Sequence, residues 1–218
     1  MILKDIVALL REEARNAHVV DDERIDDRLW EDFIMLKRNQ FVKNHYNERQ
    51  YVELNTLQTE KLTLSYYDSA LDISGVSIGS KILRSGAVPK MIEGRIGPAI
   101  YDIFGADIIS HNIMYVPFDR LRWAGSGNVN KHCLYAAYYD NRLYVKSNSE
   151  IEKPMMYLNL IAIFANPIDV STFDVTTDEY PVNDYMLNYM KSEILKGEFN
   201  GMLSKRSDEI NDSNGIIS

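Results

Sequence analysis

The period of the hydrophobic pattern changes near Gln50, and this change limits the folds that the chain can adopt. Before Gln50, apolar residues recur every three to four positions, which is the spacing of one face of an α-helix. From Gln50 to about Ala165, apolar and polar residues alternate in short runs that Gly, Pro, Asn and Asp interrupt, as in antiparallel strands. We therefore expect an α+β fold, with helices packed around or beside an antiparallel β domain that forms a sandwich or a barrel.

Residues 1–49 are expected to form a pair of helices. The first carries an apolar stripe from Leu3 onwards, and the second begins at Asp26 or Asp27, either of which could cap it, and runs to about Asn47. Because two helices cannot bury their stripes alone, they must pack on a further element. The predicted apolar face of the second helix consists of Leu29, Trp30, Phe33, Leu36 and Phe41. Its predicted solvent face consists of Glu31, Lys37, Arg38, Lys43 and Glu48.

Residues 50–168 are expected to form the β domain. The run 133–139 reaches a turn at Asp140-Asn141-Arg142 and returns through 143–145, which predicts a hairpin because Asp and Asn tolerate the positive φ of tight turns. No alternation of strands with long helices is visible, which disfavours a doubly wound α/β fold. The other predicted elements are a strand with buried Leu62, Leu64 and Tyr66, strands at 112–116 and 156–164, and one or two helical turns at 118–124.

Residues 169–203 are expected to form a polar connector and a last helix that packs with the N-terminal helices. This helix should begin after Tyr180-Pro181, with Pro181 in or near its first turn. Residues 204–218 are polar and rich in turn formers, so we expect a tail that is flexible or ordered by a partner. The predicted apolar face of the last helix consists of Met186, Tyr189, Met190 and Ile194.

The charge of the chain is acidic and unevenly distributed. The 218 residues carry a net charge of −8, whereas a nucleic-acid reader normally presents a basic face. Residues 169–218 hold 4 Lys/Arg and 10 Asp/Glu, a net charge of −6. This excess is either a solvated acidic helix and tail or an acidic surface that does not hold a passing polyanion. No run of about 18 apolar residues is present, so we expect no membrane span.

Residues that could support catalysis or cofactor binding lack the required spacing. Cys133 and His132 are neighbours on a predicted strand and would point to opposite faces, so Cys133 is interpreted as a buried strand cysteine. The four histidines are scattered without metal-ligand spacing. The glycines of 94–98 and 125–127 are interpreted as turns, and the carboxylates at Asp26 and Asp27 as helix-start residues. We therefore expect no enzyme, no metal and no cofactor.

The chain has 14 tyrosines, and several lie on the predicted strands. Cross-strand packing of the rings is the simplest interpretation. A protein–protein surface, where Tyr, Trp and Arg are enriched, is a second one, and a carbohydrate-binding face is a weaker third. The candidate interface residues are Trp123, Tyr138, Tyr139, Tyr144, Arg120, Arg122, Lys205 and Arg206.

Three segments, taken in order, resemble the ring proteins of crAss-like bacteriophages, which are short-tailed phages. The first segment is 25–42, which reads IDDRLWEDFIMLKRNQFV. The second is 88–100, VPKMIEGRIGPAI, and the third combines NPIDVS at 166–171 with DEYPVNDYM at 178–186. Each segment alone is weak, and their order and spacing over roughly residues 1–205 make the resemblance. The segment after Leu203 matches least well.

The resemblance implies a structural protein of the virion at the tail or portal vertex, made in the cytoplasm of the bacterial host. Members of this family stack as rings below the portal and form the connector and tail barrel through which DNA leaves the capsid. The implied fold is similar to the tubular adaptor proteins of podoviruses, with helices around a β domain and twelve copies per ring. The implied partners are further copies of the chain, the portal, other ring proteins and tail proteins. Genomic DNA would pass through the lumen without specific binding.

Two alternatives to the connector remain open at this point. One is another virion assembly or head-completion protein, and the other is a carbohydrate-binding β-sandwich module of the tail. Within the connector interpretation, the acidic residues of 169–218 could face the channel and avoid trapping phosphate groups. The tail 204–218 could be an arm that orders when it docks on a neighbouring ring.

Overall fold

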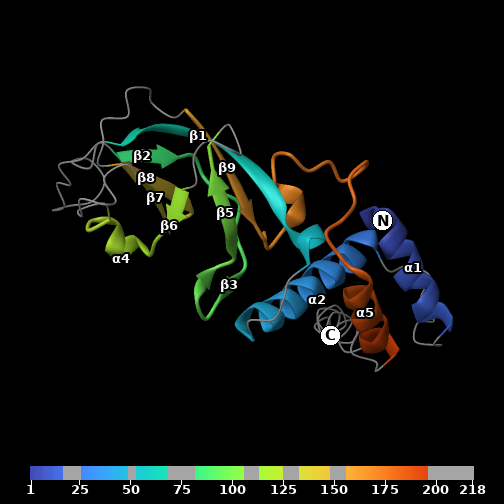
Figure 1. The fold of residues 1–218 in the computed structure, drawn as a ribbon. Coiled ribbons are helices and arrows are strands. Elements are labelled where there is room, and N and C mark those ends of the chain that lie inside the picture. The colour runs from blue at the N-terminus through green and yellow to red at the C-terminus, as the bar shows by residue number, and fades with distance from the viewer. Residues whose placement is uncertain are drawn as a thin grey trace, which may run out of the picture. The chain divides into compact units, whose positions relative to one another are not determined.

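The structure is a computed structural model, and it combines helices with a mostly antiparallel sheet (Figure 1), which confirms the α+β prediction. The chain separates into two compact units. A helical unit comprises Met1–His45 and Asp174–Ser218, and a β unit comprises Tyr46–Phe173. The structure describes residues 1–16, 26–48, 53–67, 82–105, 113–124, 133–147 and 156–195.

The helical unit contains α1 (Leu3–Asn16), α5 (Asp184–Leu195) and all but the last two residues of α2 (Asp27–Asn47). The first two helices lie where the sequence predicts them. Arg11 of α1 forms an ion pair with Asp27 of α2, and α1 contacts α5. The apolar stripes of the three helices meet in the interior of this unit. Among the buried side chains are Leu3, Ile6, Leu10, Trp30, Phe33, Ile34, Met186, Met190 and Ile194.

α5 begins three residues later than Pro181. The side-chain oxygen of Asn183 accepts a hydrogen bond of 2.8 Å from the N–H of Met186, which is the contact of an N-cap residue. Pro181 therefore precedes the helix and does not form its first turn. The start agrees with the expectation of a helix after Tyr180-Pro181, and Pro181 lies near the first turn, two residues before the cap.

The predicted solvent face of α2 is wrong at two positions. Lys37 and Arg38 are buried, whereas Leu36, expected on the apolar face, is 52% exposed. The Lys37 ammonium lies 3.1 Å from the Glu193 carboxylate of α5, and Arg38 donates through Nε to the Pro181 carbonyl at 2.8 Å. Both cations can be buried because residues far away in the chain supply their partners.

The β unit is built on a seven-stranded sheet with the order β5-β9-β1-β2-β8-β7-β6. The two edge strands, β5 and β6, also contact each other, so the sheet nearly closes into a barrel (Figure 1). Two more strands, β3 and β4, form a small separate hairpin. The strands are β1 (Gln58–Tyr67), β2 (Ile82–Ser85), β3 (Glu93–Gly94), β4 (Gly97–Pro98), β5 (Ile100–Phe104), β6 (Ile113–Tyr115), β7 (Leu134–Tyr139), β8 (Arg142–Ser147) and β9 (Tyr157–Ala162).

One strand pair departs from the antiparallel expectation. β6 and β7 run parallel, and a short helix, α4 (Phe118–Leu121), lies in the connection between them. A parallel pair needs a crossover connection of this kind. The sequence pattern did not predict it, because a three-residue strand followed by four helical residues is too short to show an alternation of strand and helix.

The hairpin of β7 and β8 confirms the prediction from Asp140 and Asn141. Both residues have positive φ, 49° and 54°, as a two-residue hairpin turn requires. The glycine-containing stretch 94–98 is also a turn, and it joins β3 to β4. The loop predicted at 125–127 lies outside the described residues.

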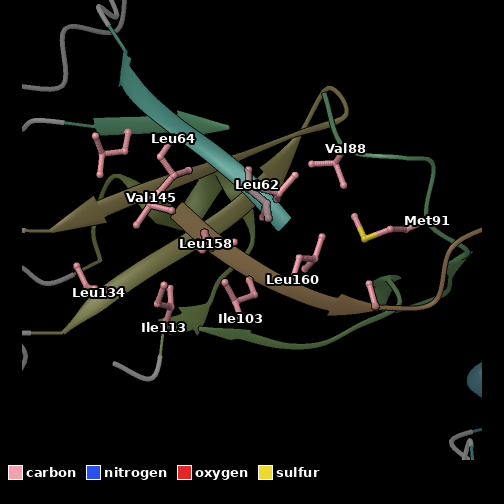
Figure 2. Close-up of a cluster of buried hydrophobic side chains, with 14 of the residues drawn as sticks. Leu62, Leu64, Val88, Met91, Ile103, Ile113, Leu134, Val145, Leu158 and Leu160 are labelled. Atoms are coloured by element: carbon pink, nitrogen blue, oxygen red, sulfur yellow. The ribbon is translucent and has the colours of Figure 1, made fainter. Parts of the chain in front are cut away.

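The main core lies on the inner face of the sheet. Leu62 of β1 pairs with Leu158 of β9, and both side chains are buried. Figure 2 shows side chains from most of the strands converging on this region. Tyr66 is 60% exposed, contrary to the expectation, although it pairs with the buried Leu83 of β2.

Candidate interaction surface

A second apolar cluster lies on the outer face of β7 and β8, beneath α4. Alternate residues of β7 point to opposite faces, so Ala136 joins the main core and Ala137 joins the outer cluster. Both faces of the sheet are therefore buried here. The outer cluster consists of Ile82, Leu121, Tyr135, Ala137 and Tyr144, with Val116, Phe118, Ala124 and Cys133 packed against it.

Lys146 of β8 fixes the end of α4. Its buried ammonium donates hydrogen bonds to the backbone carbonyls of Leu121 at 3.3 Å and Arg122 at 2.9 Å. Burial lowers the pKa of Lys146. A cation at the carbonyl end of a helix satisfies groups that the helix itself leaves unpaired. Sequence reasoning missed Lys146, although its outward position opposite Tyr135 was readable from the hairpin register.

Aromatic side chains of the hairpin hold the other side of α4. The ring of Phe118 stacks on Tyr139 at a centroid distance of 4.4 Å and an interplanar angle of 16°. Tyr144 meets the same Phe118 ring edge-on at 5.5 Å. The helix is thus fixed by apolar, aromatic and hydrogen-bonding contacts.

Arginine and aromatic side chains are exposed on the outside of this helix. Trp123 is 71% exposed, and the Arg122 guanidinium lies 5.9 Å from the centroid of its ring, a cation–π distance. Arg120 is also exposed. We call the exposed group formed by Arg120, Arg122, Trp123 and Tyr139 the α4 patch.

The structure brings together five of the candidate interface residues. Four of them form the α4 patch, and Tyr144 is buried beneath it against Phe118. Tyr138 points to the other face of β7, where its hydroxyl donates to the Asn141 side-chain oxygen at 2.8 Å. The remaining two, Lys205 and Arg206, lie outside the described residues.

A second exposed surface, which is acidic, lies in the helical unit. The carboxylate of Asp174 accepts hydrogen bonds from the hydroxyl of Thr176 at 2.6 Å and from its N–H at 2.9 Å, and these bonds hold the pKa of Asp174 below its ordinary value. Asp178 accepts from the Asp174 N–H at 2.8 Å. Glu179 and Asp184 follow and are exposed. We call Asp174, Asp178, Glu179 and Asp184 the acidic connector.

The other chemical features noted in the sequence occupy ordinary structural positions. Cys133 is half-buried just before β7, so it is not within the strand as expected. His45 stacks on Phe41 at 4.1 Å, and the other histidines lie outside the described residues. Within the described ranges, no three His, Cys, Asp or Glu side chains gather in a way that could hold a metal ion. None of the helices in this part of the chain has both the length and the apolar character of a membrane span.

Comparison with known families identifies the chain. The family model described as Phage tail ring protein 2 matches residues 5–215, which is nearly the whole sequence and extends past Leu203 into the polar tail. None of the curated proteins that were compared matches the chain. The chain belongs to the family of phage tail ring protein 2, a family of crAss-like phages, and it is therefore a structural ring protein of the virion.

Proposed function

We propose that this protein forms one ring of the connector between portal and tail, or of the tail barrel, and helps to build the conduit for genome ejection. The observation that supports this most strongly is the match of residues 5–215 to a tail ring family. In this proposal the chain works by assembly and not by catalysis. Its neighbours along the tail axis are the portal or other ring proteins, and twelve copies close each ring.

The surfaces of the monomer suit a ring subunit. A ring of identical copies is closed by head-to-tail contacts, which join two different surfaces of each copy. The α4 patch combines exposed arginine with exposed aromatic rings, whereas the acidic connector presents carboxylates. The chain therefore offers two unlike surfaces of the kind that such a contact needs.

The charge of the subunit suits a conduit for DNA. Each contact between a Lys or Arg side chain and a phosphate group adds affinity, so a lumen rich in such contacts would slow the passage of DNA. A net charge of −8 for each copy keeps non-specific affinity for DNA low. We propose that DNA passes the ring without being bound.

We further propose that different segments of the chain have separate roles, and that its fold is distantly related to that of the podoviral tubular adaptor proteins. The β domain of residues 50–168 and the helices within 1–49 and 169–203 act as separate modules, and residues 204–218 order on a partner. The combination of helices with a nearly closed sheet supports a relationship to the tubular adaptor proteins of podoviruses.

The proposal is tested by the assembly state of the full-length protein. Mass photometry and negative-stain microscopy are applied to the protein alone and in mixtures with the portal and with the other tail proteins of the same phage. We expect closed rings, alone or once a partner ring is present. A chain that remains monomeric with every one of these partners would contradict the proposal.

A further inference from the structure

We infer that the α4 patch of one copy docks on the acidic connector of the next copy and forms the lateral contact of the ring. This inference rests on the proposed function, because it needs a ring. It adds the two surfaces that meet and the chemistry that joins them, which is guanidinium and aromatic groups on one side and carboxylates on the other.

The α4 patch has the composition of an interface centre. Tryptophan, tyrosine and arginine are the residue types that most often dominate binding energy at protein–protein contacts. Trp123 exposes most of its surface, and the guanidinium of Arg122 lies over its ring. A carboxylate that approached Arg120 or Arg122 would meet a charged donor next to an apolar ring, so both kinds of contact could form together.

The α4 patch is also held in place before any partner arrives. Phe118 is packed against Tyr139 and Tyr144, and Lys146 binds the last carbonyls of the helix segment. A surface that is already ordered loses little conformational entropy on binding, which favours its use as a docking site.

The negative charge of the acidic connector is complementary to the arginines of the α4 patch. No Lys or Arg occurs between Asp169 and Met190, so the four carboxylates have no basic side chain among them in the sequence. The amino group of Met1 lies 3.2 Å from the carboxylate of Glu179. Hydrogen bonds around Asp174 fix the backbone of this segment, and the ring of Tyr185, 74% exposed, lies at its end.

The two surfaces belong to different units of the chain, which fits a contact between copies. The α4 patch lies in the β unit, and the acidic connector lies in the helical unit. Every copy therefore carries both halves of the contact, as a head-to-tail ring requires.

The test uses two full-length charge-reversal variants. Variant A is Arg120→Glu with Arg122→Glu, and variant B is Glu179→Lys with Asp184→Lys. In A the docking surfaces of a copy are both acidic. In B two lysines stand beside Asp174 and Asp178, so the acidic connector has no net charge and no longer attracts the arginines of the next copy. Each variant alone should therefore form rings about tenfold less well than the natural chain, or worse. Circular dichroism and thermal melting verify that each variant is folded.

An equimolar mixture of A and B should restore rings. In an alternating ring, the glutamates of A face the lysines of B, and the arginines of B face the carboxylates of A, so every contact is complementary again. We expect native mass spectrometry to find equal numbers of both variants in each ring. The matched control is Arg95→Glu, which reverses an exposed arginine in the turn between β3 and β4 and should leave ring formation unchanged.

Two results would overturn the inference alone, namely normal rings from either variant and failure of the mixture to form rings. If the normal rings are those of variant B and they release DNA at an altered rate, the acidic connector lies in the lumen. A natural chain that forms no ring with any partner would instead overturn the proposed function, and this inference with it.

Discussion

Lys37 and Arg38 are buried in the helical unit although both side chains are charged. The Glu193 carboxylate and the Pro181 carbonyl, which are far away in the sequence, accept their hydrogen bonds. Burial lowers the pKa of Arg38 to about 10, so the guanidinium remains charged at neutral pH. The sequence pattern assigned both residues to solvent, because a lysine or arginine on a helix is exposed unless a partner from another element accompanies it into the core. That partner is not visible in local spacing.

The buried ion pair predicts a large effect of a single substitution. Lys37→Met should lower the free energy of unfolding by about 3–5 kcal/mol, because it leaves the Glu193 carboxylate buried without its cation. The double variant Lys37→Met with Glu193→Leu should recover most of this loss. Urea denaturation followed by circular dichroism measures both variants.

The matched control for this prediction is Lys43→Met, which removes an exposed lysine of the same helix and should change stability by less than about 0.5 kcal/mol. If Lys37→Met were as stable as this control, the buried ion pair would not contribute as described.

The raised pKa of Tyr180 predicts that the free energy of unfolding falls at alkaline pH. Burial raises its pKa from the ordinary 10 to about 12, so the folded state retains a proton that the unfolded state loses. The stabilisation from this group is complete below pH 10 and is lost as the pH rises towards 12. Tyr180→Phe should therefore reduce the slope of stability against pH in this window, measured by chemical denaturation at several pH values. Identical slopes for both proteins would contradict the prediction.

The space available at Gly94 is also limited by a residue that lies far away in the sequence. A Cβ atom at this position would lie 2.5 Å from the ring of Tyr46, which donates a hydrogen bond to the Pro98 carbonyl at 3.2 Å. Gly94→Ala should cost about 1–3 kcal/mol, measured as a fall in the midpoint of urea denaturation. Gly86→Ala is the control, because a Cβ atom there meets nothing within 4 Å, and it should be neutral or slightly stabilising. Equal stability of the two variants would show that Tyr46 does not pack on Gly94.

Among the helices and strands, those whose defining residues lie close together in the sequence could be predicted from it. The boundaries of α1 and α2 and the hairpin of β7 and β8 follow from caps, periodicity and turn residues that lie next to one another. The order of the sheet was not predictable in this way. β1 pairs with β9 across about a hundred residues, and the parallel pair of β6 and β7 leaves no pattern in so short a strand.

α4 depends on an element far from it in sequence, and this gives a prediction. Lys146→Met removes the two hydrogen bonds to the Leu121 and Arg122 carbonyls, so the segment 116–124 should open more often. Hydrogen exchange followed by mass spectrometry should be faster there by about tenfold, with the strands of the main core unchanged. Lys61→Met, on an exposed position of β1, is the control and should leave exchange in 116–124 unaltered. Unchanged exchange in Lys146→Met would contradict the role of Lys146 as a cap.

At the scale of the whole molecule, composition and segment order predicted more than any single motif. The order of three weak segments indicated the ring family, and the family model matches nearly the full chain. The interface candidates selected from the sequence include Arg120, Arg122, Trp123 and Tyr139, and the structure places them, exposed, in or next to α4 and on the strand β7 that packs against it. Three of them lie in the helical turns predicted at 118–124, whereas the position of Tyr139 beside α4 could not be predicted, because Phe118 and Lys146 connect this helix to a hairpin that is separate in the sequence.

In the proposed function, identical copies of this chain surround the path of the genome. A cryo-electron microscopy map of the phage tail at side-chain resolution tests this directly. We expect the nearly closed sheet with α4 on its outer face to be repeated as a ring on the tail axis, with the α4 patch against the acidic connector of the neighbouring copy. A map in which this chain lies away from the axis, or occurs as separate copies that do not surround the channel, would show that it does not form the conduit.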